Sequence, residues 1–159
     1  MTFFKRGAKI ASRILLILLA YLIASVIAAV FALVLVAAIF AAMAGRWTDG
    51  IGIGSESLGT AVIAWVVTAL GAIPTALPAI IYAESLEVRR FKFYAVCGVL
   101  AAMIAFLLFA VYVGEFPSVL VSALVSGALL VAGLVGAGVY WSIAGRTAGE
   151  WRSLPLRTV

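Results

Sequence analysis

Residues 14–44 contain no charged side chain, and this apolar run constrains the fold more than any other feature of the sequence. A helix needs about 20 mostly apolar residues to cross a membrane, because the hydrocarbon core is about 30 Å thick. At 1.5 Å per residue this run would form a helix roughly 46 Å long. We therefore predict a membrane-crossing first helix that tilts or projects beyond the hydrocarbon core.

The composition of the whole chain also indicates a membrane protein. Of the 159 residues, 67% are hydrophobic and 11% are charged. Soluble domains are roughly 45–50% apolar and about 25% charged, whereas disordered chains are poor in apolar residues. The composition therefore excludes disorder and argues against a soluble domain.

Three further apolar runs are long enough to cross a bilayer. Because lipid cannot bond backbone groups, each run is expected to be a helix, and its continuous apolarity is unlike the alternation of a membrane β-strand. The short connection after the second run predicts an antiparallel hairpin. We predict an all-α membrane protein, a single transmembrane domain over 1–159 that forms a four-helix, up-down bundle with spans at 14–44, 60–82, 93–113 and 119–144.

Basic residues are sorted to one side of these predicted spans. All but Arg46 fall in the N-terminal tail, the connection between the second and third spans, or the C-terminal tail. Basic loops stay in the cytoplasm, so we predict that both termini are cytoplasmic. Orientation also accounts for the net charge of +5, so the expected partner is the lipid bilayer and not a nucleic acid. The sorted residues are Lys5, Arg6, Lys9, Arg13, Arg89, Arg90, Lys92, Arg146, Arg152 and Arg157.

The basic start followed by an apolar run also resembles a secretory signal, whose cleavage would fall near Ala29. The apolar region of a signal is only about 7–15 residues long, however. We therefore favour an uncleaved first helix.

The side chains needed for several chemistries are missing from the sequence. There is no His, and Cys97, the one Cys, lies in an apolar run and is expected to be a packing residue. No Asp, Glu, Lys or Arg lies in the middle of a predicted span, although ion-coupled transporters usually place a charge there. We expect no catalytic residues, no metal and no cofactor.

The second span has a candidate hinge at Gly71, Pro74 and Pro78. Each proline removes a backbone donor and crowds the preceding turn, and Thr68 and Thr75 are placed to bond the freed carbonyls. The kink is expected either to be fixed, shaping the bundle, or to form a hinge or binding site.

The fourth span is rich in small residues at helical spacing. Such patterns let helix backbones approach closely. The face is expected to pack against the protein's own helices, or to dock a second copy or another membrane subunit. The candidate packing residues are Ser122, Ser126, Gly133, Gly136 and Ala137, and Ser118 extends the same pattern.

Charged residues gather in the connection after the second span and again after the fourth. Glu84, Arg89, Arg90 and Arg146 are candidates for contact with lipid headgroups or a partner, and their simplest role is orientation with local pairing. Glu87 and Arg90 are three residues apart and would pair if the helix continued.

Three stretches, 78–84 (PAIIYAE), 89–94 (RRFKFY) and 140–149 (YWSIAGRTAG), carry a resemblance to uncharacterised small four-span proteins of alphaproteobacteria. The likeness covers the last three spans. It implies a location in a bacterial inner membrane, implies no known activity, and points to Glu84, Arg89 and Arg146 as the residues of interest.

Helix packing is the function that these features favour. We expect a non-enzymatic integral membrane protein that acts as an accessory or assembly subunit or as a self-associating bundle. The alternative is a small oligomeric channel or transporter that uses the second span. A third hypothesis is a lipid-interface enzyme that uses Glu84 or Glu87 with Arg89 or Arg146.

Overall fold

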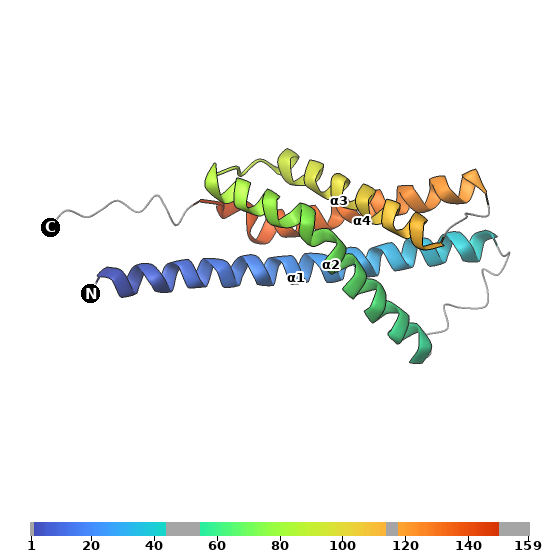
Figure 1. Ribbon diagram of the computed structural model, residues 1–159, viewed down its shortest axis with the longest axis horizontal. Coiled ribbons are helices and arrows are strands. Elements are labelled where there is room, and N and C mark those ends of the chain that lie inside the picture. Colours follow the sequence, from blue (N-terminus) through green and yellow to red (C-terminus); the bar gives the residue numbers. More distant parts are fainter. Residues whose placement is uncertain (1, 44–54, 114–117, 150–159) are drawn as a thin grey trace.

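A computed structural model describes residues 2–43, 55–113 and 118–149, and this part of the chain is all-helical. Figure 1 shows α1 extending along the whole molecule, with α3 and α4 packed together beside it and α2 crossing over it. The predicted all-α class is confirmed. The elements are α1 (Thr2–Met43), α2 (Ser55–Ser85), α3 (Phe91–Val113), α4 (Val119–Ile143) and the short 3-10 helix η1 (Gly145–Thr147).

Three of the described helices contain a stretch long and apolar enough to cross a membrane. These stretches are Ile10–Ile39, Phe91–Leu108 and Val119–Ile143. Large apolar side chains cover their outer surfaces, and Leu15 and Leu107 are more than half exposed. An apolar surface of this extent is typical of contact with lipid, as expected of a multi-pass membrane protein.

The first helix is longer than the apolar run that predicts it. α1 has 42 residues, which corresponds to roughly 63 Å, and it begins at Thr2, well before residue 14. Lys and Arg are good helix formers, so the basic residues before the run extend the helix. The start of the apolar run therefore marks a change of surroundings within one continuous helix.

The second helix continues through both of its prolines. α2 includes Pro74 and Pro78 and changes direction along its length (Figure 1). Gly71, the third candidate hinge residue, faces Leu108 of α3, because an added Cβ would lie 3.8 Å from its Cδ1 atom. In Figure 1, α2 crosses α1, and its first and second halves lie on opposite sides of α1 in that view.

Hydroxyl groups near this bend bond to carbonyls of α2. The Thr75 hydroxyl donates to the Ala72 carbonyl at 2.9 Å, which is not one of the carbonyls left free by the prolines. The Thr68 side chain lies outside the described residues. From α1, the Tyr21 hydroxyl donates to the carbonyl of Ala69, so one side-chain bond ties the two helices together just before the bend.

The small residues of α4 pack inside the chain, against two different helices. A Cβ on Gly133 would lie 2.5 Å from the carbonyl oxygen of Gly98 in α3. A Cβ on Gly136 would lie 3.0 Å from the Cβ of Ala28 in α1. Glycine at these positions lets the backbones approach, as close helix packing in membranes requires.

The other predicted packing residues of α4 differ in their contacts. Ala137 borders the Gly98 contact, at 2.7 Å from an added Cβ there. Ser122 and Ser126 are half-buried, and the Ser126 hydroxyl donates to the Ala123 carbonyl of its own helix. The Ser118 hydroxyl accepts from the amide of Val121 and caps the start of α4.

Candidate functional site

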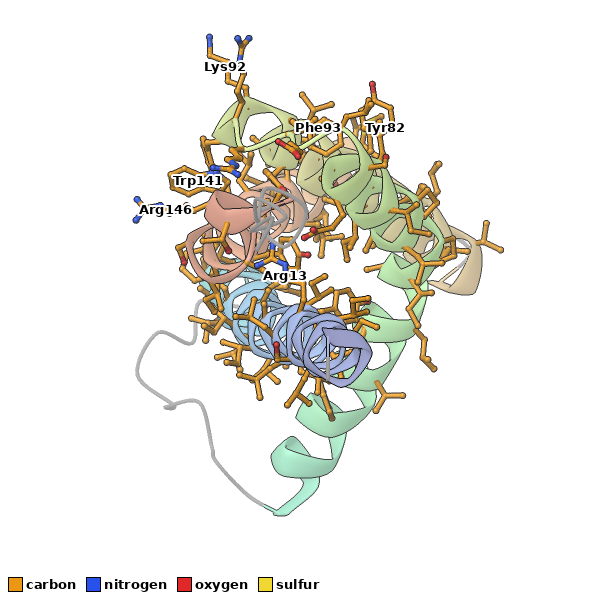
Figure 2. The ribbon with its side chains drawn as sticks, turned by 90° about the vertical axis from the view of Figure 1, so that its left-hand side faces the viewer. Arg13, Tyr82, Lys92, Phe93, Trp141 and Arg146 are labelled. Atoms are coloured by element: carbon orange, nitrogen blue, oxygen red, sulfur yellow. The ribbon has the colours of Figure 1, made fainter. Side chains whose placement is uncertain are left out.

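Four segments meet at one end of the molecule, namely the first third of α1, the end of α2, the start of α3 and the segment after α4. Figure 2 looks onto this end. Arg13 lies between the helices, whereas Lys92 and Arg146 point outward. Burying an arginine costs free energy unless its charge is paired and hydrogen-bonded. The partners of Arg13 therefore show how this end is held together.

Arg13 of α1 and Glu84 of α2 form an ion pair in this position. The Nη2 atom of Arg13 lies 2.6 Å from Oε1 of Glu84, and its Nε atom donates to the same oxygen at 3.1 Å. The two side chains are only 12% and 15% exposed. The pair is therefore largely removed from solvent and linked by two charge-assisted hydrogen bonds.

Both members of the pair also bind the segment that follows α4. Arg13 donates to the hydroxyl of Thr147 at 2.6 Å and to the carbonyl of Ala144 at 2.9 Å. The free carbonyls at a helix C-terminus favour a cation, and Ala144 is the C-cap of α4. Oε2 of Glu84 accepts from the amide of Gly149 at 3.0 Å. We call Arg13, Glu84, Thr147 and Gly149 the clamp.

The backbone around the clamp depends on Gly149. Its φ is +78°, in the left-handed region that favours glycine, and an added Cβ would collide with the side chain of Glu87. Glu87 also has a positive φ, of 53°, because α2 ends at Ser85 and the chain turns. The helical spacing that would have paired Glu87 with Arg90 is therefore lost.

The same turn is fixed from the side of α4. The Arg89 Nε atom donates to the carbonyl of Ala148 at 3.0 Å, and Trp141 Nε1 donates to the carbonyl of Arg89 at 2.9 Å. The Arg146 guanidinium lies 4.5 Å from the centre of the Trp141 ring, a cation–π contact. The Tyr94 hydroxyl donates to the carbonyl of Val88 at 3.0 Å. The connection between α2 and α3 is thus joined to α4 and to the segment that follows it.

The geometry of the clamp is suited to holding segments together. Both oxygens of Glu84 accept hydrogen bonds, and the Arg13 guanidinium has three separate partners. Among the described residues, no group of three or more metal-ligating side chains is found. A carboxylate whose two oxygens both accept bonds within the protein is poorly placed to act as a general base.

The structure brings together only some of the residues highlighted by the sequence. Glu84 lies in the clamp, and Arg89 and Arg146 lie beside it. Arg90 is exposed, in the connection between α2 and α3. The candidate hinge and the α4 packing residues lie on the helices, away from this end. Arg46, Arg152 and Arg157 fall outside the described residues.

Sequence reasoning missed Arg13, Thr147 and Gly149 as clamp residues. One signal was present for Arg13. It precedes the first apolar run, while Glu84 follows the second, so an up-down arrangement places opposite charges at the same end. No sequence signal distinguishes Thr147 or Gly149, because their roles depend on how the chain turns after α4.

A cavity of about 150 Å³ lies between the four helices. Alanine and glycine supply most of its walls, and Cys97 is also part of them. The polar side chains that line it are those of Tyr21, Ser25, Thr75, Tyr94 and Tyr140. The cavity therefore has apolar walls with a few neutral polar groups.

Comparisons of the chain with models of protein families, with curated proteins and with solved structures gave no match.

Proposed function

We propose that the protein is a non-enzymatic integral membrane protein that acts by helix packing, as an accessory or assembly subunit or as a self-associating bundle. All four helices cross a bacterial inner membrane in an up-down order with both termini in the cytoplasm. The inclusion of α2 is supported by its 31 residues and by the lack of charge over 60–82.

The clamp is the observation that carries this proposal. Its two charges join three parts of the chain, because Arg13 and Glu84 bond to each other and each also bonds to the segment after α4. Catalytic or transport carboxylates need to reach a substrate. The clamp charges instead form bonds within the protein, which supports a role that depends on the shape of the bundle.

The proposed orientation is supported by the charge at the clamp end. Lys92 and Arg146 point outward there (Figure 2), and Arg90, two residues before Lys92, is also exposed. Basic side chains at the cytoplasmic face agree with the positive-inside rule. Reporter domains fused to either terminus are expected to be active in the cytoplasm, and an externally active terminal reporter would overturn the orientation.

The apolar outer surface of α1 is the face we assign to lipid and to partner helices. Leu18, Leu22, Val26 and Val30 are each exposed by roughly two fifths or more. Gly133 and Gly136 already pack against α3 and α1 of the same chain. Association with a second copy or another subunit would therefore use outer apolar faces, and lipid would cover the rest.

Native mass spectrometry of the protein in bilayer discs cut from its own membranes tests the packing role. We expect an assembly heavier than the 16.6 kDa chain, with a fixed number of copies or a fixed ratio to one partner. Glu84→Gln is expected to lower the assembled fraction, and Lys92→Gln serves as the matched control. A monomer in these discs would contradict the proposal.

A channel or transporter is the second candidate, because the bent part of α2 lines the cavity through Thr75 and Ala76. Liposomes containing the purified protein separate the two functions. Under the packing proposal they release no more trapped ions or small solutes than empty liposomes do. Solute flux that is lost on Pro74→Ala or Pro78→Ala would favour the transporter.

A further inference from the structure

One tyrosine that lines the cavity between the helices has a hydroxyl group that bonds to none of the described residues. Tyr140 is 9% exposed and lines the cavity. Its hydroxyl forms no hydrogen bond with any residue that the structure describes, whereas the hydroxyls of Tyr21 and Tyr94 donate to Ala69 and Val88. Buried tyrosine hydroxyls normally find a hydrogen-bond partner. The Tyr140 hydroxyl is therefore available to a molecule in the cavity.

The walls of the cavity define the polarity of such a molecule. None of the described residues that line it is an Asp, Glu, Lys or Arg, so a charged molecule would lose its hydration without compensation. The hydroxyls of Ser25 and Thr75 already donate to the carbonyls of Leu22 and Ala72. Among the described hydroxyls on the walls, that of Tyr140 is the one whose hydrogen is not used within the protein, and most of the other wall residues are apolar. The cavity therefore favours an uncharged, mainly apolar molecule.

The volume of the cavity limits the size of the molecule. About 150 Å³ is available, and apolar cavities of roughly this size in proteins accept a ring such as benzene. The walls come from all four helices and consist mostly of short side chains, among them Ala76 of α2, Ala101 of α3 and Ala132 of α4. The volume is enough for a single ring, and Tyr140 is one of the residues that such a ring would meet.

We propose that the cavity is a binding site for a small lipophilic molecule with a single carbonyl acceptor. Its apolar ring lies among the alanines, and its oxygen accepts a hydrogen bond from the Tyr140 hydroxyl. Such a molecule dissolves in the bilayer and reaches the site from there. None of the four clamp residues lines the cavity, and the proposal does not rest on the packing role.

Two probes of the same shape test the hydrogen bond. Acetophenone carries the carbonyl, and α-methylstyrene replaces its oxygen with a CH2 group. The full chain in lipid discs, labelled with ¹³C at alanine methyl groups, is titrated with each probe. Each dissociation constant refers to the probe concentration measured in the bilayer. Saturable shifts are expected at the methyl groups of Ala76 and Ala101, and none at the exposed Ala123.

The expected difference is a fold-change in affinity. A net hydrogen bond corresponds to about a three- to ten-fold tighter binding of acetophenone, and Tyr140→Phe should remove this preference. Ala101→Leu should abolish binding by filling the cavity, while Ala123→Leu on the outer face of α4 should leave it unchanged. If Tyr140→Phe does not fold, the ratio between the two probes on the native chain still decides.

Three results would overturn the proposal. Equal affinity of the two probes would show that the hydroxyl takes no part. Shifts at Ala123 as large as those at Ala101 would show partition into lipid only. Magnetisation transfer to the cavity methyls from a lipid chain or from water that acetophenone does not displace would show a different occupant.

Discussion

Arg13 and Glu84 are 71 residues apart in the sequence, yet the Arg13 Nη2 atom lies 2.6 Å from Oε1 of Glu84. This pair joins α1 to α2, and through Ala144 and Gly149 it also holds the segment after α4. Exposed ion pairs contribute little to stability. Here both partners are largely buried, so removal of one leaves the other without compensation.

Glu84→Gln is predicted to destabilise the protein by about 3 kcal/mol, because the buried Arg13 guanidinium loses its counter-charge. The amide keeps the shape of the side chain, so the effect reports on charge more than on packing. Unfolding in detergent, followed by the loss of helical circular dichroism, measures the change. Lys92→Gln, at an exposed position of the same end, should change stability by less than about 0.5 kcal/mol.

Replacement of both clamp charges by apolar side chains is predicted to cost less than the sum of the single changes. Arg13→Met with Glu84→Leu leaves no unpaired buried charge, and such replacements are often nearly neutral. The coupling free energy from the double-mutant cycle should exceed about 1 kcal/mol. Strict additivity of the two single changes would show that the pair does not act as a unit.

Several helix limits could be predicted from the sequence because charge, proline and hydropathy change together there. The helices α3 (Phe91–Val113) and α4 (Val119–Ile143) begin and end within two residues of the apolar runs at 93–113 and 119–144. The start of α1 could not be predicted in this way. Hydropathy reports the surroundings of a helix, whereas Lys and Arg extend it without a break.

The candidate site was only partly accessible to sequence reasoning. Glu84, Arg89 and Arg146 could be selected because charge is scarce in this chain. Their contacts could not be predicted, since Arg13 reaches Glu84 only when α1 and α2 pack in a particular register. The role of Gly149 depends on a positive φ and on the nearby Glu87, neither of which leaves a pattern in the sequence.

Gly149→Ala is predicted to destabilise the chain by about 1–3 kcal/mol, because a non-glycine residue at positive φ is strained and the added Cβ meets Glu87. The loss should be confined to the clamp end, so amide exchange should accelerate at residue 149 and at Thr147 before the helices open. Gly7→Ala is the control, since nothing lies within 4 Å of an added Cβ there. Slow exchange at Thr147 in the variant would contradict this role.

Trp141→Phe is predicted to loosen the connection between α2 and α3. The indole donates to the Arg89 carbonyl and stacks under Arg146, and a lost hydrogen bond of about 1 kcal/mol corresponds to roughly five-fold more local opening. Trypsin cleaves after Arg89 and Arg90, so the initial rate of cleavage at these sites in detergent measures that opening. Ser142→Ala, an exposed neighbour on α4, should leave the rate unchanged.

Gly133→Ala is predicted to destabilise the α3–α4 contact by about 1–3 kcal/mol, the usual cost of overpacking. The added Cβ would lie 2.5 Å from the backbone oxygen of Gly98, and a backbone atom cannot rotate aside as a side chain can. Gly127→Ala on the same helix has open space around the new methyl group and should gain up to about 1 kcal/mol from helix propensity. Opposite signs for the two variants in the same unfolding assay would separate contact from propensity. Equal stabilisation by both would show that α3 and α4 do not approach through Gly133.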